Sequence, residues 1–133
     1  MSTTLTIRDE STTALGRPGL VWTLACPAER LTARALIELR VRHEVEAHNL
    51  RQSEVFQGLI QPSEAERALN GGRPRQHRPL DWRRQVRRAW EAFEANGFIL
   101  LVDERQVESL DQSLELGPVT TVTFLKLVPL VGG

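Results

Sequence analysis

The spacing of apolar residues changes twice along this chain, and this change constrains the fold more than any other feature. Apolar and polar residues alternate around Leu5 and Ile7, which predicts a strand at about residues 4–8, and residues 20–24 predict a second strand. The polar turn between these two strands predicts that they form a hairpin. The spacing is helical in the middle of the chain and strand-like again from Phe98 onwards. This order predicts an α+β fold in which helices cover one face of a mixed sheet.

The first helix is predicted at about residues 33–48, and Thr32 is a suitable N-cap for it. Its apolar residues recur on one side at helical spacing: Leu36, Ile37, Val41 and Val45. Residues 49–80 then predict an insert, in which Ser63 opens a short helix and residues 71–79 form an exposed loop.

A second helix shows the clearest period in the sequence. Asp81 is its predicted N-cap, and Asn96-Gly97 ends it. The apolar stripe between these ends is predicted to pack in the core: Trp82, Val86, Ala89, Trp90 and Phe93. Because both tryptophans belong to this stripe, they do not indicate stacking on nucleic-acid bases.

Arginines are concentrated around the start of the second helix. They are Arg73, Arg75, Arg78, Arg83, Arg84, Arg87 and Arg88. They could form a solvated face paired with nearby glutamates, a docking surface for an acidic protein, or a nucleic-acid contact. The zero net charge of the chain makes nucleic acid the least favoured of the three. We take Arg83, Arg84, Arg87 and Arg88 as candidate partner-binding residues.

The C-terminal third predicts further strands. Residues 98–102 form a continuous apolar run, which predicts a buried strand, and residues 103–104 predict a turn before a short strand at 106–107. Residues 108–118 are predicted to be a polar connection. Residues 119–128 then predict the last strand, which we place at the centre of the sheet.

Lys126 is the only lysine in the sequence and lies in this last strand. Alternation places it on the same face as Val122 and Phe124, where a buried lysine would lose its hydration at a cost of several kcal/mol. We therefore expect either that Lys126 reaches the rim of the sheet or that this face is partly open to solvent, with Leu125 and Leu127 packed under the helices. Lys126 is then predicted to contact a partner protein.

Composition narrows the classes of function. The 133 residues carry a formal net charge of zero and are 41% hydrophobic, which fits one domain, residues 1–133. No apolar run approaches the roughly 20 residues of a membrane span, and no signal segment is evident, so a cytoplasmic location is expected. Cys26 is the only cysteine, and His43 and His48 lack the spacing of a helical zinc pair, so no metal site is expected.

The end of the sequence, TFLKLVPLVGG, carries the strongest functional signal. Pro129 cannot continue a central ladder, so residues 129–133 are predicted to leave the sheet as a flexible tail. Gly132 and Gly133 have no side chains and can therefore thread through a narrow channel, close to the backbone of a partner. An enzyme that activates a terminal carboxylate needs this access.

The stretch FILLVDERQVESLDQSLELGPVTTVTFLKLVPLVGG, which begins at Phe98, resembles the C-terminal half of the MoaD and ThiS sulfur carriers and of ubiquitin-like modifiers, including bacterial ones. The matching parts are the strand 99–102, the turn after it, the last strand and the Gly-Gly tail with Pro129. The N-terminal strand and residues 33–48 fit the family loosely, and residues 49–97 have no counterpart in the compact carriers. The resemblance implies a ubiquitin-like β-grasp fold.

The same resemblance implies a ubiquitin-like protein modifier that an E1-like adenylating enzyme activates with Mg-ATP. The protein would be a substrate of that enzyme and not an enzyme, with no cofactor of its own. Gly132 and Gly133 match the positions of acyl transfer, and Pro129, Leu130 and Val131 match positions that the enzyme grips. Further implied partners are target proteins joined by an isopeptide bond, an E2-like enzyme and a deconjugating protease. The alternatives are a sulfur carrier with a C-terminal thiocarboxylate and an unconjugated adaptor.

Overall fold

The computed structural model describes residues 2–12, 19–51, 59 and 80–127. The chain divides into two compact units: Met1–Leu36 with Trp90–Gly133, and Ile37–Ala89. Two helices, α1 (Ala33–Arg51) and α3 (Trp82–Glu94), contribute residues to both units. The short helix and the exposed loop predicted between residues 52 and 79 lie outside the described residues.

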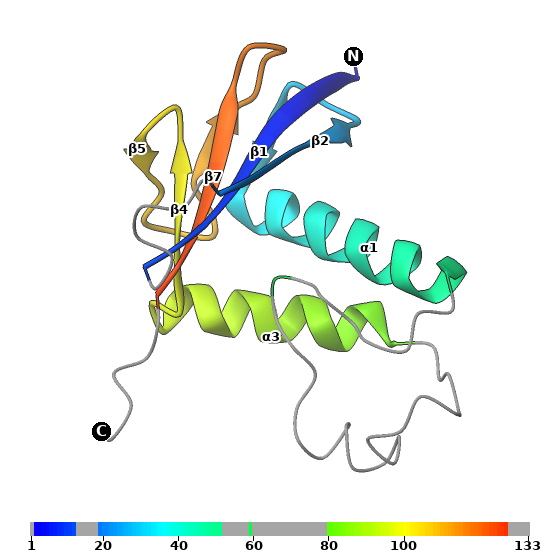
Figure 1. Cartoon of the computed structure of the whole chain (residues 1–133). Coiled ribbons are helices and arrows are strands. Elements are labelled where there is room, and N and C mark those ends of the chain that lie inside the picture. Colours follow the sequence, from blue (N-terminus) through cyan, green and yellow to red (C-terminus); the bar gives the residue numbers. More distant parts are fainter. Residues whose placement is uncertain (1, 13–18, 52–58, 60–79, 128–133) are drawn as a thin grey trace. The chain divides into compact units, whose positions relative to one another are not determined.

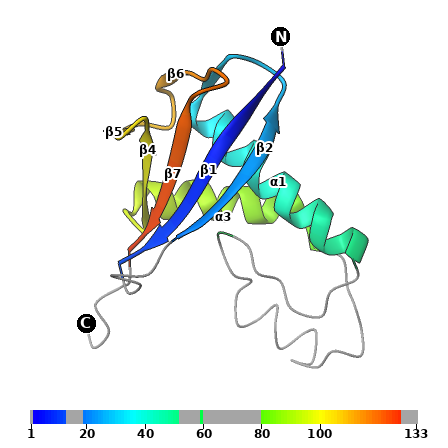
Figure 2. The ribbon, with the colours of Figure 1, turned by 45° about the horizontal axis from the view of Figure 1, so that its top comes forward.

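The first unit contains a five-stranded mixed sheet (Figure 1). Its strands are β1 (Thr3–Ser11), β2 (Leu20–Cys26), β4 (Phe98–Val102), β5 (Arg105–Gln106) and β7 (Thr121–Lys126). Their order across the sheet is β2-β1-β7-β4-β5, with β2 at one edge and β5 at the other (Figure 2). β1 is antiparallel to β2 and parallel to β7, whereas β7 is antiparallel to β4. The α+β class, the first hairpin and the central place of the last strand are therefore confirmed.

The register of these pairs puts alternate apolar residues on one buried face of the sheet. Ile7 pairs with Trp22 on one side and with Val122 on the other, and Leu100 pairs with Phe124. Side chains on this face are almost completely buried: Leu5, Ile7, Leu24, Leu100, Val122 and Phe124. The ring of Phe98 lies between those of Phe93 and Phe124, with ring centroids 5.9 Å apart in both pairs.

β4 is not buried on both faces as its continuous apolar run predicts. Phe98 and Leu100 are buried, but Ile99, Leu101 and Val102 are only partly covered. Successive side chains of a strand point to opposite faces, so a run without polar residues need not be buried throughout.

A two-residue turn joins β4 to β5 where the sequence predicts it. Asp103 and Glu104 have φ angles of 48° and 70°, and the flanking residues Val102 and Arg105 are paired, as in a type I′ hairpin. Asp103 also fixes the start of β7, because its Oδ1 accepts a hydrogen bond from Thr121 N at 2.9 Å and its own N–H donates to Thr121 O at 2.9 Å.

The prediction that residues 108–118 are only a polar connection is wrong. This stretch contains β6 (Ser113–Glu115), which pairs with β3 (Arg30–Thr32) in a second, two-stranded sheet. It also buries three leucines: Leu110, Leu114 and Leu116. A three-residue strand is too short to show alternation, and its flanking charged and polar residues hid the buried positions.

The same stretch supports the beginning of α1. Two N–H groups that lack partners within the helix, those of Ala33 and Arg34, donate to Gln112 O at 2.9 Å and Leu110 O at 2.8 Å. Thr32 is the N-cap as predicted, since its Oγ1 accepts a hydrogen bond from Ala35 N at 3.1 Å.

In the second unit, the C-terminal part of α1 lies beside the N-terminal part of α3. The side chain of Asn49 accepts a hydrogen bond from Leu80 N at 2.9 Å and donates one to Leu80 O at 3.2 Å. The guanidinium of Arg42 lies over the ring of Trp82, 4.3 Å from its centroid. Asp81 is confirmed as the cap of α3, because its Oδ1 accepts a hydrogen bond from Arg83 N at 3.0 Å.

The apolar stripe of α3 is only partly core. Val86, Ala89 and Phe93 are buried, but Trp82 and Trp90 are half-buried, so the expectation that both tryptophans pack in the core is wrong. Both indoles instead lie under guanidinium groups. The buried position that completes the stripe is polar: Gln85.

Candidate functional site

The tail residues selected from the sequence, Pro129, Leu130, Val131, Gly132 and Gly133, lie outside the described residues. The structure instead describes the place from which the tail departs, the end of β7. We call Lys126 and Leu127, with the strand ends that hold them, the tail root.

The tail root is held from both sides within the first unit. Lys126 pairs with Ser11 of β1 and with Phe98 of β4, and Lys126 O accepts a hydrogen bond from Thr12 N at 3.1 Å. Beyond the strand, Leu127 N donates to Gly97 O at 3.2 Å. The backbone is therefore fixed up to Leu127.

The turn that supports Leu127 is itself rigidly built. α3 ends at Glu94, and Asn96 takes a left-handed conformation with φ 60°. Gly97 N then donates to Ala92 O at 2.7 Å, and a Cβ on Gly97 would lie 3.2 Å from that same oxygen. Asn96 thus performs the helix-ending role for which glycine is more usual, while Gly97 allows the close approach.

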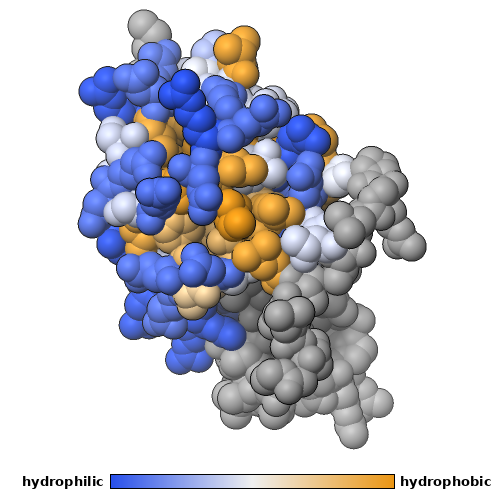
Figure 3. Space-filling view, turned by 90° about the vertical axis from the view of Figure 1, so that its left-hand side faces the viewer, coloured by the Kyte–Doolittle hydropathy of each residue, from blue (hydrophilic) through white to orange (hydrophobic). Residues whose placement is uncertain are grey.

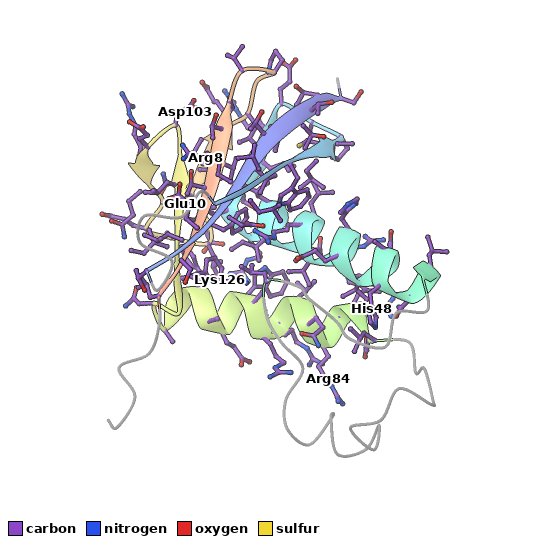
Figure 4. The ribbon with its side chains drawn as sticks, viewed as in Figure 1. Arg8, Glu10, His48, Arg84, Asp103 and Lys126 are labelled. Atoms are coloured by element: carbon purple, nitrogen blue, oxygen red, sulfur yellow. The ribbon has the colours of Figure 1, made fainter. Side chains whose placement is uncertain are left out.

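Of the two expected positions, Lys126 takes the one at the rim of the sheet and does not lie on a face open to solvent. It shares its face with Val122 and Phe124, but that face is the buried one, and the partly exposed side chains are Leu125 and Leu127. The expectation that Leu125 and Leu127 are the packed residues is therefore wrong. Lys126 is half-buried because it lies at the last position of the strand, near the rim of the sheet (Figure 4).

A small apolar patch lies on the other face of the sheet beside the tail root. Ile99 pairs with Leu125, and Leu101 pairs with Thr123, so Ile99, Leu101 and Leu125 share this outer face and are partly exposed. Figure 3 shows apolar side chains gathered among hydrophilic ones on the side of the molecule that carries β4. We call these three residues the outer patch.

An ion pair flanks the outer patch on β1. Arg8 and Glu10 pair with Thr123 and Leu125 across the parallel ladder, which puts both on the outer face (Figure 4). Arg8 Nη2 donates to Glu10 Oε1 at 2.8 Å. An apolar centre with a charged border is the usual composition of a protein contact surface.

A pocket of about 370 Å³ also lies in the first unit, beside the turn that holds Leu127. Its lining includes Arg34, Phe93, Glu94, Asn96, Phe98, Glu108, Ser109, Leu110 and Asp111. These residues include no histidine, cysteine or lysine. The hydroxyl of Ser109 accepts a hydrogen bond from Asp111 N at 3.2 Å, as in a local turn. No pattern in the sequence indicates this pocket, because residues 108–111, which form part of its wall, belong to a stretch that the sequence predicts to be a polar connection.

The four candidate arginines of α3 belong to the second unit. Arg83, Arg84 and Arg87 are exposed and Arg88 is half-buried. The guanidinium of Arg83 lies 4.8 Å from the centroid of the Trp82 ring.

The described residues contain no group of three or more histidine, cysteine, aspartate or glutamate side chains that could hold a metal ion. In the same part of the chain, no helix combines the length and the apolar character needed to cross a membrane. Comparison of the chain with protein-family models, with curated proteins and with solved structures finds no match.

Proposed function

We propose that this protein is a ubiquitin-like modifier with a β-grasp fold, activated at the carboxylate of Gly133 by an E1-like adenylating enzyme. The observation that carries the proposal is the position of β7. It is the central strand, it pairs in parallel with β1, and its end is held on both sides up to Leu127. A fixed root of this kind supports presentation of the following segment to an enzyme.

The length of that segment suits the chemistry. Residues 128–133 are six in number and, if extended, could reach about 20 Å from the root at roughly 3.3–3.6 Å per residue. A carboxylate at that reach could enter a buried ATP site. The two glycines keep the end of the segment narrow, which such a channel requires.

The proposed reaction has three steps. A carboxylate oxygen of Gly133 attacks the α-phosphorus of ATP, pyrophosphate leaves, and an acyl-adenylate forms. A thiolate of the enzyme and then an amine of the target attack the carbonyl carbon, with AMP and the thiolate as successive leaving groups. The outer patch is a surface of the folded domain beside the tail root, and an activating enzyme could bind this surface together with the tail.

The test compares conjugates in the cells that carry the gene. An N-terminally tagged wild type should give higher-mass adducts, and a variant that lacks Gly132 and Gly133 should give none. Both proteins should have the same melting temperature, because every described contact of the fold lies before residue 128. Intact-mass measurement of the untagged protein checks that Gly133 is its carboxyl terminus.

Adducts that persist in the deletion variant would overturn the proposal. A terminal thiocarboxylate in place of adducts, detected in the same intact-mass measurement, would favour the sulfur carrier instead. Neither product in the wild type would favour an unconjugated adaptor.

A further inference from the structure

The edge strand β2 has no charged residue, proline or bulge, features that usually protect the edge of a sheet. Charged side chains, prolines and bulges commonly prevent such edges from pairing with another chain. β2 reads LVWTLAC, without charge or proline, over seven residues. Leu20 and Val21 at its start are 65% and 58% exposed.

The register shows which backbone groups of β2 point away from the sheet. Thr6 N donates to Thr120 O and Thr12 N donates to Lys126 O, both on the β7 side of β1. Because successive residues of a strand direct their backbone N–H and C=O groups to opposite sides, the even-numbered residues of β1 direct theirs to β7 and the odd-numbered residues direct theirs to β2. The odd residues of β1 pair with even residues of β2, for example Ile7 with Trp22. Val21, Thr23 and Ala25 therefore direct their N–H and C=O groups outward, and all three residues are exposed.

We propose that this edge pairs with the β2 edge of a second copy of the chain, antiparallel, around a two-fold axis at Thr23. In this register Thr23 faces Thr23, and Val21 faces Ala25 on either side. Each facing pair exchanges two hydrogen bonds, about six in all, and the two sheets become continuous. The proposal does not depend on the proposed function.

Two observations favour a second copy over a peptide of another protein. β2 is uncharged, so it offers a foreign strand no electrostatic complement and opposes its own copy with no repulsion. The net charge of the chain is zero, which removes long-range repulsion between copies.

The side chains of this register are compatible on both faces. Thr23 lies opposite its own copy, and threonine pairs of this kind stabilise antiparallel ladders. On the other face Trp22 comes opposite Leu24, which joins two apolar side chains across the axis. Trp22 keeps its internal partner, since its Nε1 donates to Asp9 Oδ2 at 2.8 Å.

The test is the mass in solution over a concentration series, with a reductant present. We expect the mass of the wild type to rise from 15.0 kDa towards twice that value as concentration increases. Thr23→Lys, which places two like charges at the axis, should remain a monomer. The matched control Thr4→Lys changes an exposed threonine on the same face of the neighbouring strand and should dimerise as the wild type does.

A charge-exchange experiment separates loss of pairing from loss of folding. Thr23→Glu should also be monomeric, whereas an equimolar mixture with Thr23→Lys should recover the dimer, because Glu then faces Lys at the axis. A monomeric wild type, a dimeric Thr23→Lys, or a mixture that stays monomeric would each overturn the proposal. A monomeric wild type that binds an extended peptide at this edge would assign the edge to another protein.

Discussion

Gln85 offers a direct test of how the second unit is stabilised. Its side chain is 1% exposed, and neither its Nε2 nor its Oε1 has a hydrogen-bond partner in the part of the chain that the structure describes. It lies on the buried side of α3 next to Val86. A buried amide without partners lowers stability, so replacing it by an apolar side chain of similar size should stabilise the protein.

The magnitude follows from the desolvation of the amide. Measurements on proteins put the cost of burying such a group without partners at about 1–3 kcal/mol. Leucine has at least the helix propensity of glutamine, so the backbone adds no opposing cost. We therefore expect Gln85→Leu to raise the free energy of unfolding by about 1–3 kcal/mol.

Urea denaturation followed by tryptophan fluorescence measures this change, since the chain has three tryptophans. A gain of about 2 kcal/mol with a slope of about 2 kcal/mol/M moves the midpoint up by about 1 M. Gln85→Glu is the matched control of opposite sign, because an ionised carboxylate buried without a partner should cost about 3–5 kcal/mol. A midpoint for Gln85→Leu below that of the wild type would show that the amide is bonded in solution, and the reasoning would be wrong.

Two further substitutions test contacts within each unit. Glu44→Ala should lower the free energy of unfolding by about 1–3 kcal/mol, because it removes the oxygen that accepts from Arg40 Nε at 3.2 Å and from Leu59 N at 3.1 Å. An unchanged midpoint in urea would contradict this. Trp90→Phe should lower the free energy of unfolding by about 1 kcal/mol. The substitution removes the hydrogen bond from Trp90 Nε1 to Arg34 O at 3.0 Å but keeps an aromatic ring under the guanidinium of Arg34. An unchanged thermal midpoint would show that this hydrogen bond contributes nothing.

Local signals in the sequence were sufficient for the ends of the helices and for the main strands. Thr32 and Asp81 are caps in the structure because their side-chain oxygens accept N–H groups that a first turn leaves unpaired. The first hairpin and the last strand were predicted because they are long enough to show a period.

The errors arise where local spacing permits two answers. In β7 both faces carry apolar residues, Val122 and Phe124 on one and Leu125 on the other, so alternation alone does not select the buried face. The parallel register with β1 selects it, because Val122 lies opposite the buried Ile7. The candidate site was predicted less well than the fold, since the tail lies outside the described residues and the outer patch depends on the pairing of Ile99 with Leu125.

The central position of β7 has a consequence for synthesis on the ribosome. β1 and β2 form one hairpin, β4 and β5 form another, and among the described strands only β7 joins them. Thr6 pairs with Thr121, and this pair cannot form until the ribosome has synthesised the residues between them. At about 5–20 residues per second, this synthesis takes on the order of ten seconds. A nascent chain interrupted before β7 holds two separate hairpins with exposed apolar edges, which makes it a substrate for chaperones and proteases. Only a chain translated through β7 can complete the sheet.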